Sequence, residues 1–252
     1  MALLEVSEVS IGFGGIRAVD GVSFAVEAGE VFSIIGPNGA GKTTLFNLIS
    51  RIYDADAGRI VYDGREITEA PPHTIVRGGI ARTFQNINLF EHSTVLDNLM
   101  LGRYRHDRSN LLRQIAFTPF VRNEKRRDRR KVEEVIDFLE LEKYRDKYVS
   151  GLPYGVRKVI ELGRALATEP RLLLLDEPSS GLNPEERNDL IFWIQDMRDD
   201  LNITIVMIEH DMGLVSAVSD RVLAVNSGRV LALGAPAEVQ RNPDVIAAYL
   251  GD

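Results

Sequence analysis

The chain has 252 residues, of which 44% are hydrophobic and 27% charged, a composition typical of a globular protein with a sizeable core. Its formal net charge of −7 disfavours general affinity for nucleic acid, and we expect no nucleic-acid partner. The absence of cysteine excludes a disulfide framework and a thiolate metal site.

The first part of the chain predicts strands and one helix. Residues 4–9 and 21–29 alternate in hydrophobicity, as half-buried strands do. Residues 30–35 form a short apolar strand that ends at a glycine, and 43–49 have helical spacing. The Asp-Gly pair within 58–67 predicts a hairpin. We therefore expect an antiparallel β subdomain near the N-terminus, beside one buried strand.

The middle of the chain is typical of helices. Residues 95–145 are rich in helix formers, and apolar side chains recur at helical spacing at Val132, Val135, Ile136 and Leu139. The dense charge run at 122–131 is interpreted as a solvated helix face or a connection, because acidic residues are mixed into it. We expect residues 90–155 to form an inserted helical subdomain.

The last part returns to alternating strands and helices. Residues 171–178 and 203–210 predict fully buried strands, and 184–201 predict a helix with Pro184 in its first turn. A short helix and a final strand pair follow, at 211–220 and 221–234. Buried strands separated by helices indicate an α/β fold with a mainly parallel sheet. The whole chain, 1–252, is then one domain whose core comprises 1–89 and 156–252.

The stretch "GPNGAGKTT", residues 36–44, follows a predicted strand and precedes a predicted helix. It fits the phosphate-loop pattern, in which glycines let the backbone wrap phosphate oxygens and successive N–H groups supply positive potential. The lysine reaches the β- and γ-phosphates, and the first threonine ligates Mg²⁺. The alternative is a glycine-rich turn with an accidental lysine. The residues expected to hold the nucleotide are Gly36, Asn38, Gly39, Ala40, Gly41, Lys42, Thr43 and Thr44.

A phosphate loop alone leaves kinases, GTPases, helicases and transport ATPases open. "LLLLDEP" ends a buried strand with two acids. Because burying unpaired carboxylates is costly, we expect them to bind a cation or to exchange a proton. In a phosphate-loop protein, Asp176 would hold Mg²⁺ through water, and Glu177 would take the proton of an attacking water. The alternative is an ordinary acidic boundary between strand and loop.

Two further polar side chains follow predicted strands. His210 lies at the tip of a strand expected to neighbour the Asp176 strand, so it would contact the γ-phosphate or orient the water. A structural histidine is the open alternative. Gln85, in "ARTFQN", would offer an amide to Mg²⁺ or to the water, although alone it is weak evidence.

In combination, these motifs resemble the nucleotide-binding subunit of an ATP-binding cassette transporter over nearly the whole chain. "GPNGAGKTT" resembles its Walker A motif, Gln85 its Q-loop, and "LLLLDEP" its Walker B with the catalytic glutamate. "SSGLNP" resembles its D-loop and "EHD" its switch histidine. Phe13 matches the aromatic position that stacks on adenine. The resemblance implies a P-loop NTPase core, ATP hydrolysis, and ATP and Mg²⁺ as cofactors.

The signature motif departs from the family pattern. Where the family has Leu-Ser-Gly-Gly-Gln, this chain has "LPYGV", so Pro153 replaces the serine and Val156 the glutamine. Gly155 is retained at the start of the following helix, where its N–H would still serve the nucleotide of a second subunit. The alternative is a degenerate, inactive site. The presence of the lysine, both acids and the histidine argues against it.

The form Leu-x-Tyr-Gly is similar to one subgroup, the ATP-binding subunits of branched-chain amino-acid importers. "ARTFQNINLF", "GLNPEE" and the tail "NPDVIAAYLGD" agree with it. Similar subunits also serve systems for small amides, urea or carboxylates, so the solute stays open.

The resemblance implies that two subunits pair head to tail around ATP, as a homodimer or as a heterodimer with a paralogous ATPase. Integral membrane permeases and, indirectly, a periplasmic or extracellular solute-binding protein are the implied partners. The chain itself shows no signal peptide and no bilayer-spanning run, so we expect a peripheral protein at the cytoplasmic face of the inner membrane. The uncharged side chains of Asn86, Ile87, Leu89 and Phe90 would form part of the docking cleft; alternatively, Leu89 and Phe90 pack within the helical subdomain.

Two other classes of protein fit the sequence less well. A soluble cassette ATPase acting as a switch would have two cassettes or a long coiled-coil arm, and the interval between the phosphate loop and the acids is too short for such an arm. A small-molecule kinase would need an acceptor-binding lid, and it would not need the signature motif.

Overall fold

The computed structural model describes residues 2–85, 87–106 and 119–250. The chain divides into two compact units, unit 1 (Met1–Arg82 and Arg171–Asp252) and unit 2 (Thr83–Pro170). Unit 2 extends beyond the predicted insert 90–155 on both sides. On the C-terminal side the reason lies in helix α6 (Tyr154–Leu166), which packs at Gly163 against Leu99 and Leu139 and so belongs with the inserted helices.

Unit 1 contains a six-stranded sheet in the order β10-β9-β3-β8-β7-β6, in which all neighbours are parallel except β10 and β9. Strands β3, β7 and β8 are buried along their whole length, which confirms the predicted buried strands. The carboxyl ends of the five parallel strands therefore share one edge. The strands are β3 (Val31–Ile35), β6 (Ile80–Arg82), β7 (Leu172–Asp176), β8 (Thr204–Ile208), β9 (Arg221–Asn226) and β10 (Arg229–Gly234).

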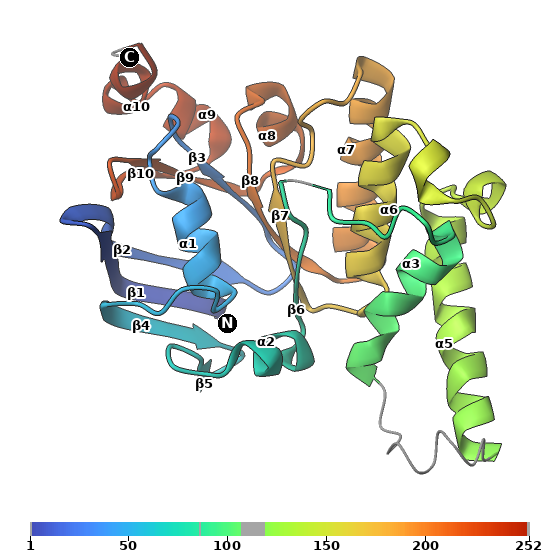
Figure 1. Ribbon diagram of the computed structural model, residues 1–252. Coiled ribbons are helices and arrows are strands. Elements are labelled where there is room, and N and C mark those ends of the chain that lie inside the picture. Colours follow the sequence, from blue (N-terminus) through green and yellow to red (C-terminus); the bar gives the residue numbers. More distant parts are fainter. Residues whose placement is uncertain (1, 86, 107–118, 251–252) are drawn as a thin grey trace. The chain divides into compact units, whose positions relative to one another are not determined.

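A second, antiparallel sheet in unit 1 has the order β2-β1-β4-β5. Asp63 and Gly64 turn between β4 and β5 with φ of 49° and 70°, as the Asp-Gly pair predicts for a tight hairpin. Helix α1 (Lys42–Ile49) lies between the two sheets, and one hydrophobic core joins all three (Figure 1). The strands are β1 (Ala2–Phe13), β2 (Ile16–Glu27), β4 (Ala57–Tyr62) and β5 (Arg65–Glu66).

The remaining helices of unit 1 connect or follow these strands. Helix α7 begins as predicted, with Pro184 in its first turn and a capping box between Asn183 and Glu186. These helices are α2 (Pro72–Gly78), α7 (Pro184–Asp199), α8 (Met212–Val218), α9 (Pro236–Gln240) and α10 (Pro243–Leu250).

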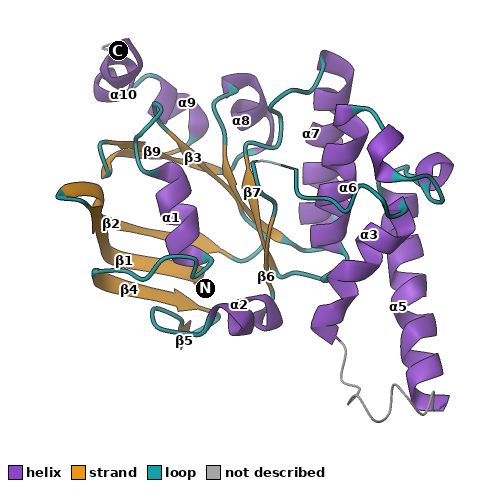
Figure 2. Cartoon of the chain, in the orientation of Figure 1, coloured by secondary structure: helices purple, strands orange, loops and turns teal. Residues whose placement is uncertain are grey.

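Unit 2 is helical in its described residues, as Figure 2 shows. Val132, Ile136 and Leu139 are buried, as their spacing predicts, and the charge run at 122–131 lies on helix α5, mostly exposed. Among the described residues, no helix combines the length and apolar character required to cross a bilayer. The helices are α3 (Val95–Leu101), η1 (Gly102–His106), α5 (Pro119–Phe138), η2 (Glu142–Tyr144), η3 (Val149–Gly151) and α6 (Tyr154–Leu166).

Candidate active site

The glycine-rich loop joins β3 to α1 and is shaped by two close backbone approaches. A Cβ on Gly36 (φ 153°) would lie 2.1 Å from the carbonyl oxygen of Val225, and one on Gly41 (φ 98°) would lie 2.2 Å from that of Ala18. Both positions therefore require glycine. Gly41 precedes α1 without any side-chain cap, so no side chain satisfies the first N–H groups of the helix.

Lys42 lies inside this loop and is 8% exposed. Its Nζ donates hydrogen bonds to the carbonyl oxygens of Gly36 at 2.7 Å and Pro37 at 2.9 Å. Burial lowers the pKa of the Lys42 ammonium, and the charges of Glu177 and Asp176 oppose that shift. The loop thus holds a poorly solvated cation, which favours an anionic ligand. Thr43, beside it, is exposed and Thr44 is half-buried.

The two acids follow β7 at the same sheet edge. Asp176 is 2% exposed and pairs in register with Ile208 of β8. Burial raises the pKa of the Asp176 carboxyl, and the Arg82 guanidinium opposes that shift. Glu177 is half-buried with a left-handed backbone (φ 49°), which is uncommon for a residue with a side chain. Its N–H donates to the carbonyl oxygen of Ile208 at 3.0 Å, which fixes this turn.

An arginine that the sequence analysis did not single out contacts the first acid. The Nη2 of Arg82, the last residue of β6, lies 2.9 Å from Oδ2 of Asp176. The sequence feature that could have indicated Arg82 is its charge, which interrupts the short apolar strand before Gln85.

His210 follows β8, which lies between β3 and β7. The prediction that the strand before His210 neighbours the Asp176 strand is therefore confirmed. The His210 side chain is exposed. Glu209 before it is fully buried and accepts hydrogen bonds from the backbone N–H groups of Ser179 at 2.8 Å and His210 at 3.1 Å. This carboxylate, also missed from the sequence, ties the loop after β8 to the loop after β7.

Two aromatic side chains of unit 1 make further contacts. Phe13 is 46% exposed and makes an edge contact with Tyr53, with ring centroids 5.2 Å apart. Burial raises the pKa of the Tyr249 hydroxyl, on α10, and the backbone of Gly36 opposes that shift. Neither tyrosine was predicted, since each lies far along the chain from the residue it contacts.

The other predicted site residues belong to unit 2. Gln85 is exposed, and Gly155 is buried in the first turn of α6. Pro153 is the N-cap of α6 and supplies no side-chain hydrogen bond. The placement of these residues beside the nucleotide stays a prediction.

The predicted docking segment also belongs to unit 2. Phe90 is 59% exposed, which favours a contact surface, whereas Ile87 and Leu89 are half-buried, which favours packing within the unit. Asn86 lies outside the described residues.

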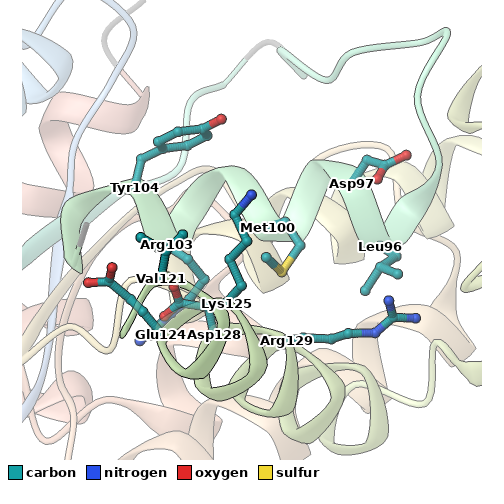
Figure 3. Close-up of a pocket in the computed structure, with 10 residues that line it drawn as sticks. All are labelled: Leu96, Asp97, Met100, Arg103, Tyr104, Val121, Glu124, Lys125, Asp128 and Arg129. Carbon is teal, nitrogen blue, oxygen red and sulfur yellow. The ribbon is translucent and has the colours of Figure 1, made fainter. Parts of the chain in front are cut away.

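Unit 2 also has a hollow of about 450 Å³ between the segment α3–η1 and α5 (Figure 3). Charges of both signs line it around Met100 and Val121. Arg103 closes one side through a 3.0 Å ion pair with Asp128. None of the predicted site residues contributes to the hollow. The lining is Leu96, Asp97, Met100, Arg103, Tyr104, Val121, Glu124, Lys125, Asp128 and Arg129.

A glycine loop with a buried lysine, followed by paired acids at one edge of a mainly parallel sheet, defines a P-loop nucleotide-binding protein. A family model described as "ABC transporter" matches residues 19–180, and one described as "Branched-chain amino acid ATP-binding cassette transporter" matches 229–252. The chain therefore belongs to the ABC transporter family, as an ATP-binding ATPase subunit.

Known relatives align along nearly the full chain. The chain is 42% identical over 250 residues to the high-affinity branched-chain amino acid transport ATP-binding protein BraF of Pseudomonas aeruginosa, covering 99% of this chain and 98% of that protein. It is 39% identical over the same shares to LivG of Salmonella typhimurium, a protein of the same description.

Solved structures confirm the fold. The nucleotide-free ATP-binding cassette of an ABC transporter is 31% identical, with a TM-score of 0.87 and full coverage of both chains. The ADP conformation of MJ1267, another such cassette, is 32% identical with the same TM-score and coverage.

Proposed function

We propose that this chain hydrolyses ATP to power an importer of branched-chain amino acids or related small polar solutes, at the cytoplasmic face of the membrane. The observation that carries the proposal is the convergence of Lys42, Asp176, Glu177 and His210 at one edge of the β3-β8-β7 strands. The solute class is supported by the printed names of the relatives and by the family match at the C-terminus.

The residues of unit 1 fit a magnesium nucleotide. The loop that excludes a Cβ at Gly36 and Gly41 leaves its amides for phosphate oxygens, and Lys42 supplies the neutralising charge. The described residues contain no group of three or more histidines or acids that could hold a metal ion alone. This agrees with Mg²⁺ held by Thr43, Asp176 and Gln85 together with phosphate oxygens, which is the usual manner for this ion. When bound, Mg²⁺ would neutralise charge on the phosphates.

The remaining roles fall to side chains of this chain. Glu177, in the left-handed turn that follows β7, accepts the proton of the attacking water. His210 contacts the γ-phosphate or orients the water. Phe13 stacks on adenine, and its edge contact with Tyr53 holds the ring in place.

Each nucleotide lies between the phosphate loop of one subunit and the signature of another. The uncapped start of α6, with Gly155 in its first turn, presents N–H groups to the phosphates of the partner subunit. The partner is a second copy or a paralogous ATPase. Exposed Phe90, in the segment after Gln85, contacts the permease subunits, and a solute-binding protein acts on these from the other side of the membrane.

The test is transport by the complete system. Proteoliposomes containing this chain, its permeases and the binding protein, with ATP supplied to the cytoplasmic side, are expected to accumulate radiolabelled leucine. Isoleucine and valine should compete, and urea and short amides should not. Stimulation by urea or an amide in place of leucine would reassign the solute. Full ATPase activity of the isolated chain, unaffected by permeases, would instead indicate a soluble switch ATPase.

A further inference from the structure

Arg82 is a buried arginine whose guanidinium contacts the metal-binding acid. It is held from several sides within unit 1. Its Nη2 donates to Oδ2 of Asp176 at 2.9 Å, and its Nη1 donates to Oδ1 of Asn47 at 2.7 Å and to Oγ of Ser50 at 3.0 Å. The guanidinium carbon lies 5.5 Å from the centre of the Phe46 ring. These contacts place a fixed positive charge against the carboxylate that is proposed to bind Mg²⁺.

The pair is too deeply buried to be an incidental surface contact. The side chains of Arg82 and Asp176 are 7% and 2% exposed. Desolvation of such a pair offsets most of its attraction, so a contribution to stability alone is a weak reason for its presence. Arg82 instead connects two parts of the site: Asn47 lies in α1, the helix that follows the phosphate loop, Ser50 is the C-cap of that helix, and Asp176 ends β7.

We infer that Arg82 is the resident counter-cation of Asp176, a positioning residue that holds this carboxylate in a fixed orientation before the magnesium nucleotide arrives and prevents the acid from binding a divalent cation alone. The inference rests on the proposed role of Asp176 toward Mg²⁺. Because one Asp176 oxygen accepts from Arg82, a metal ion that approaches without phosphate meets a carboxylate whose charge is already balanced. The nucleotide phosphates supply the additional negative charge that makes binding favourable.

The experiment measures Mn²⁺ binding to the nucleotide-free full-length chain by electron paramagnetic resonance. Arg82→Gln removes the charge but retains hydrogen-bonding capacity. Its affinity for Mn²⁺ is expected to exceed that of the unchanged protein by about tenfold or more. Arg171→Gln is the matched control, since Arg171 precedes the same strand β7 and pairs with exposed Asp63 at the opposite end. The control should leave Mn²⁺ affinity unchanged.

Arg82→Lys separates charge from geometry and covers the case in which Arg82→Gln does not fold. Lysine retains the cation but lacks the planar fork that joins Asp176 to Asn47 and Ser50. Mn²⁺ affinity should stay as low as in the unchanged protein, while kcat for Mg·ATP falls at an unchanged nucleotide Kd.

The outcomes are distinct. A folded Arg82→Gln that binds Mn²⁺ no better than the unchanged protein overturns the inference, as does full turnover in Arg82→Lys. Failure of the unchanged protein to bind ATP or ADP at all would defeat the proposed function. The Mn²⁺ comparison, which uses no nucleotide, would still decide the role of Arg82.

Discussion

In unit 1 the side chains of Arg82 and Asp176 are 7% and 2% exposed, whereas in unit 2 the Arg145 and Glu133 side chains keep 24% and 33% of their surface exposed. Both pairs are joined by hydrogen bonds. The first lies at the edge of a sheet of buried strands, and the second lies at the water-facing side of a helix. The two ion pairs have the same chemistry and differ in how deeply their side chains are buried.

Coulomb interactions are several times stronger in a poorly solvated site than at a surface, and so are the penalties for leaving a charge without its partner. Charged residues in unit 1 are therefore expected to affect binding and chemistry strongly. Most charged residues in unit 2 are expected to affect stability slightly. Arg103 of unit 2 breaks this division, because it is 3% exposed and contacts Asp128, Glu169 and the carbonyl oxygen of Ala167.

The largest effect is expected for Glu177→Gln in unit 1. The amide cannot accept the proton of the attacking water, so ATP turnover should fall by about 10²- to 10⁴-fold while ATP affinity is retained. The variant should also accumulate as an ATP-bound dimer, which size-exclusion chromatography detects. Glu185→Gln, exposed on α7, is the control. Unchanged turnover in Glu177→Gln would remove this carboxylate from the mechanism.

The second-largest effect is expected for Arg103, the buried arginine of unit 2. Arg103→Met leaves Asp128 and the Ala167 carbonyl without their buried donor, so the free energy of unfolding should fall by about 3 kcal/mol or more. Hydrogen exchange at the amides of α5 and α6 measures the loss within this unit. Arg129→Met is the matched control, because Arg129 lies next to Asp128 on α5 and is 59% exposed. Equal losses in the two variants would contradict the role of burial.

The third effect concerns the cation of the phosphate loop. Lys42→Ala removes the charge that faces the phosphates, so nucleotide affinity should weaken by about ten- to a hundredfold, measured by isothermal titration calorimetry with ADP. Lys131→Ala, on the exposed part of α5, should bind like the unchanged protein. Retained affinity in Lys42→Ala would show that the loop does not hold the phosphates.

The features predicted from sequence are those whose cause is local. The phosphate-loop pattern at 36–44, the Asp63-Gly64 turn and the buried strands can each be recognised from residues a few positions apart, through motif spacing, turn geometry or hydrophobic period. The placement of His210 beside the Asp176 strand was also within reach, since parallel strands end at one edge.

The features that were missed depend on contacts between distant residues. Arg82 and Asp176 are separated by 94 positions, and nothing near Arg82 indicates which acid it contacts. Tyr53, in the loop after α1, contacts Phe13 at the end of β1. The wider extent of unit 2 follows from the packing of α6 at Gly163, which the order of elements along the chain does not reveal.

The smallest effect is expected for the partly exposed pair of unit 2. The Arg145 guanidinium, hydrogen-bonded to Glu133, holds the pKa of that carboxyl below its usual range. A depressed folded-state pKa stabilises the fold above the ordinary glutamate pKa of about 4.3, and the contribution disappears as pH falls through the folded value. At pH 7, Glu133→Gln should therefore cost about 0.5–1 kcal/mol in urea unfolding. The difference from the unchanged protein should shrink as the pH is lowered below about 4. Glu134→Gln, one position on and 54% exposed, should cost less at pH 7, and an equal cost would show that the Arg145 contact contributes nothing.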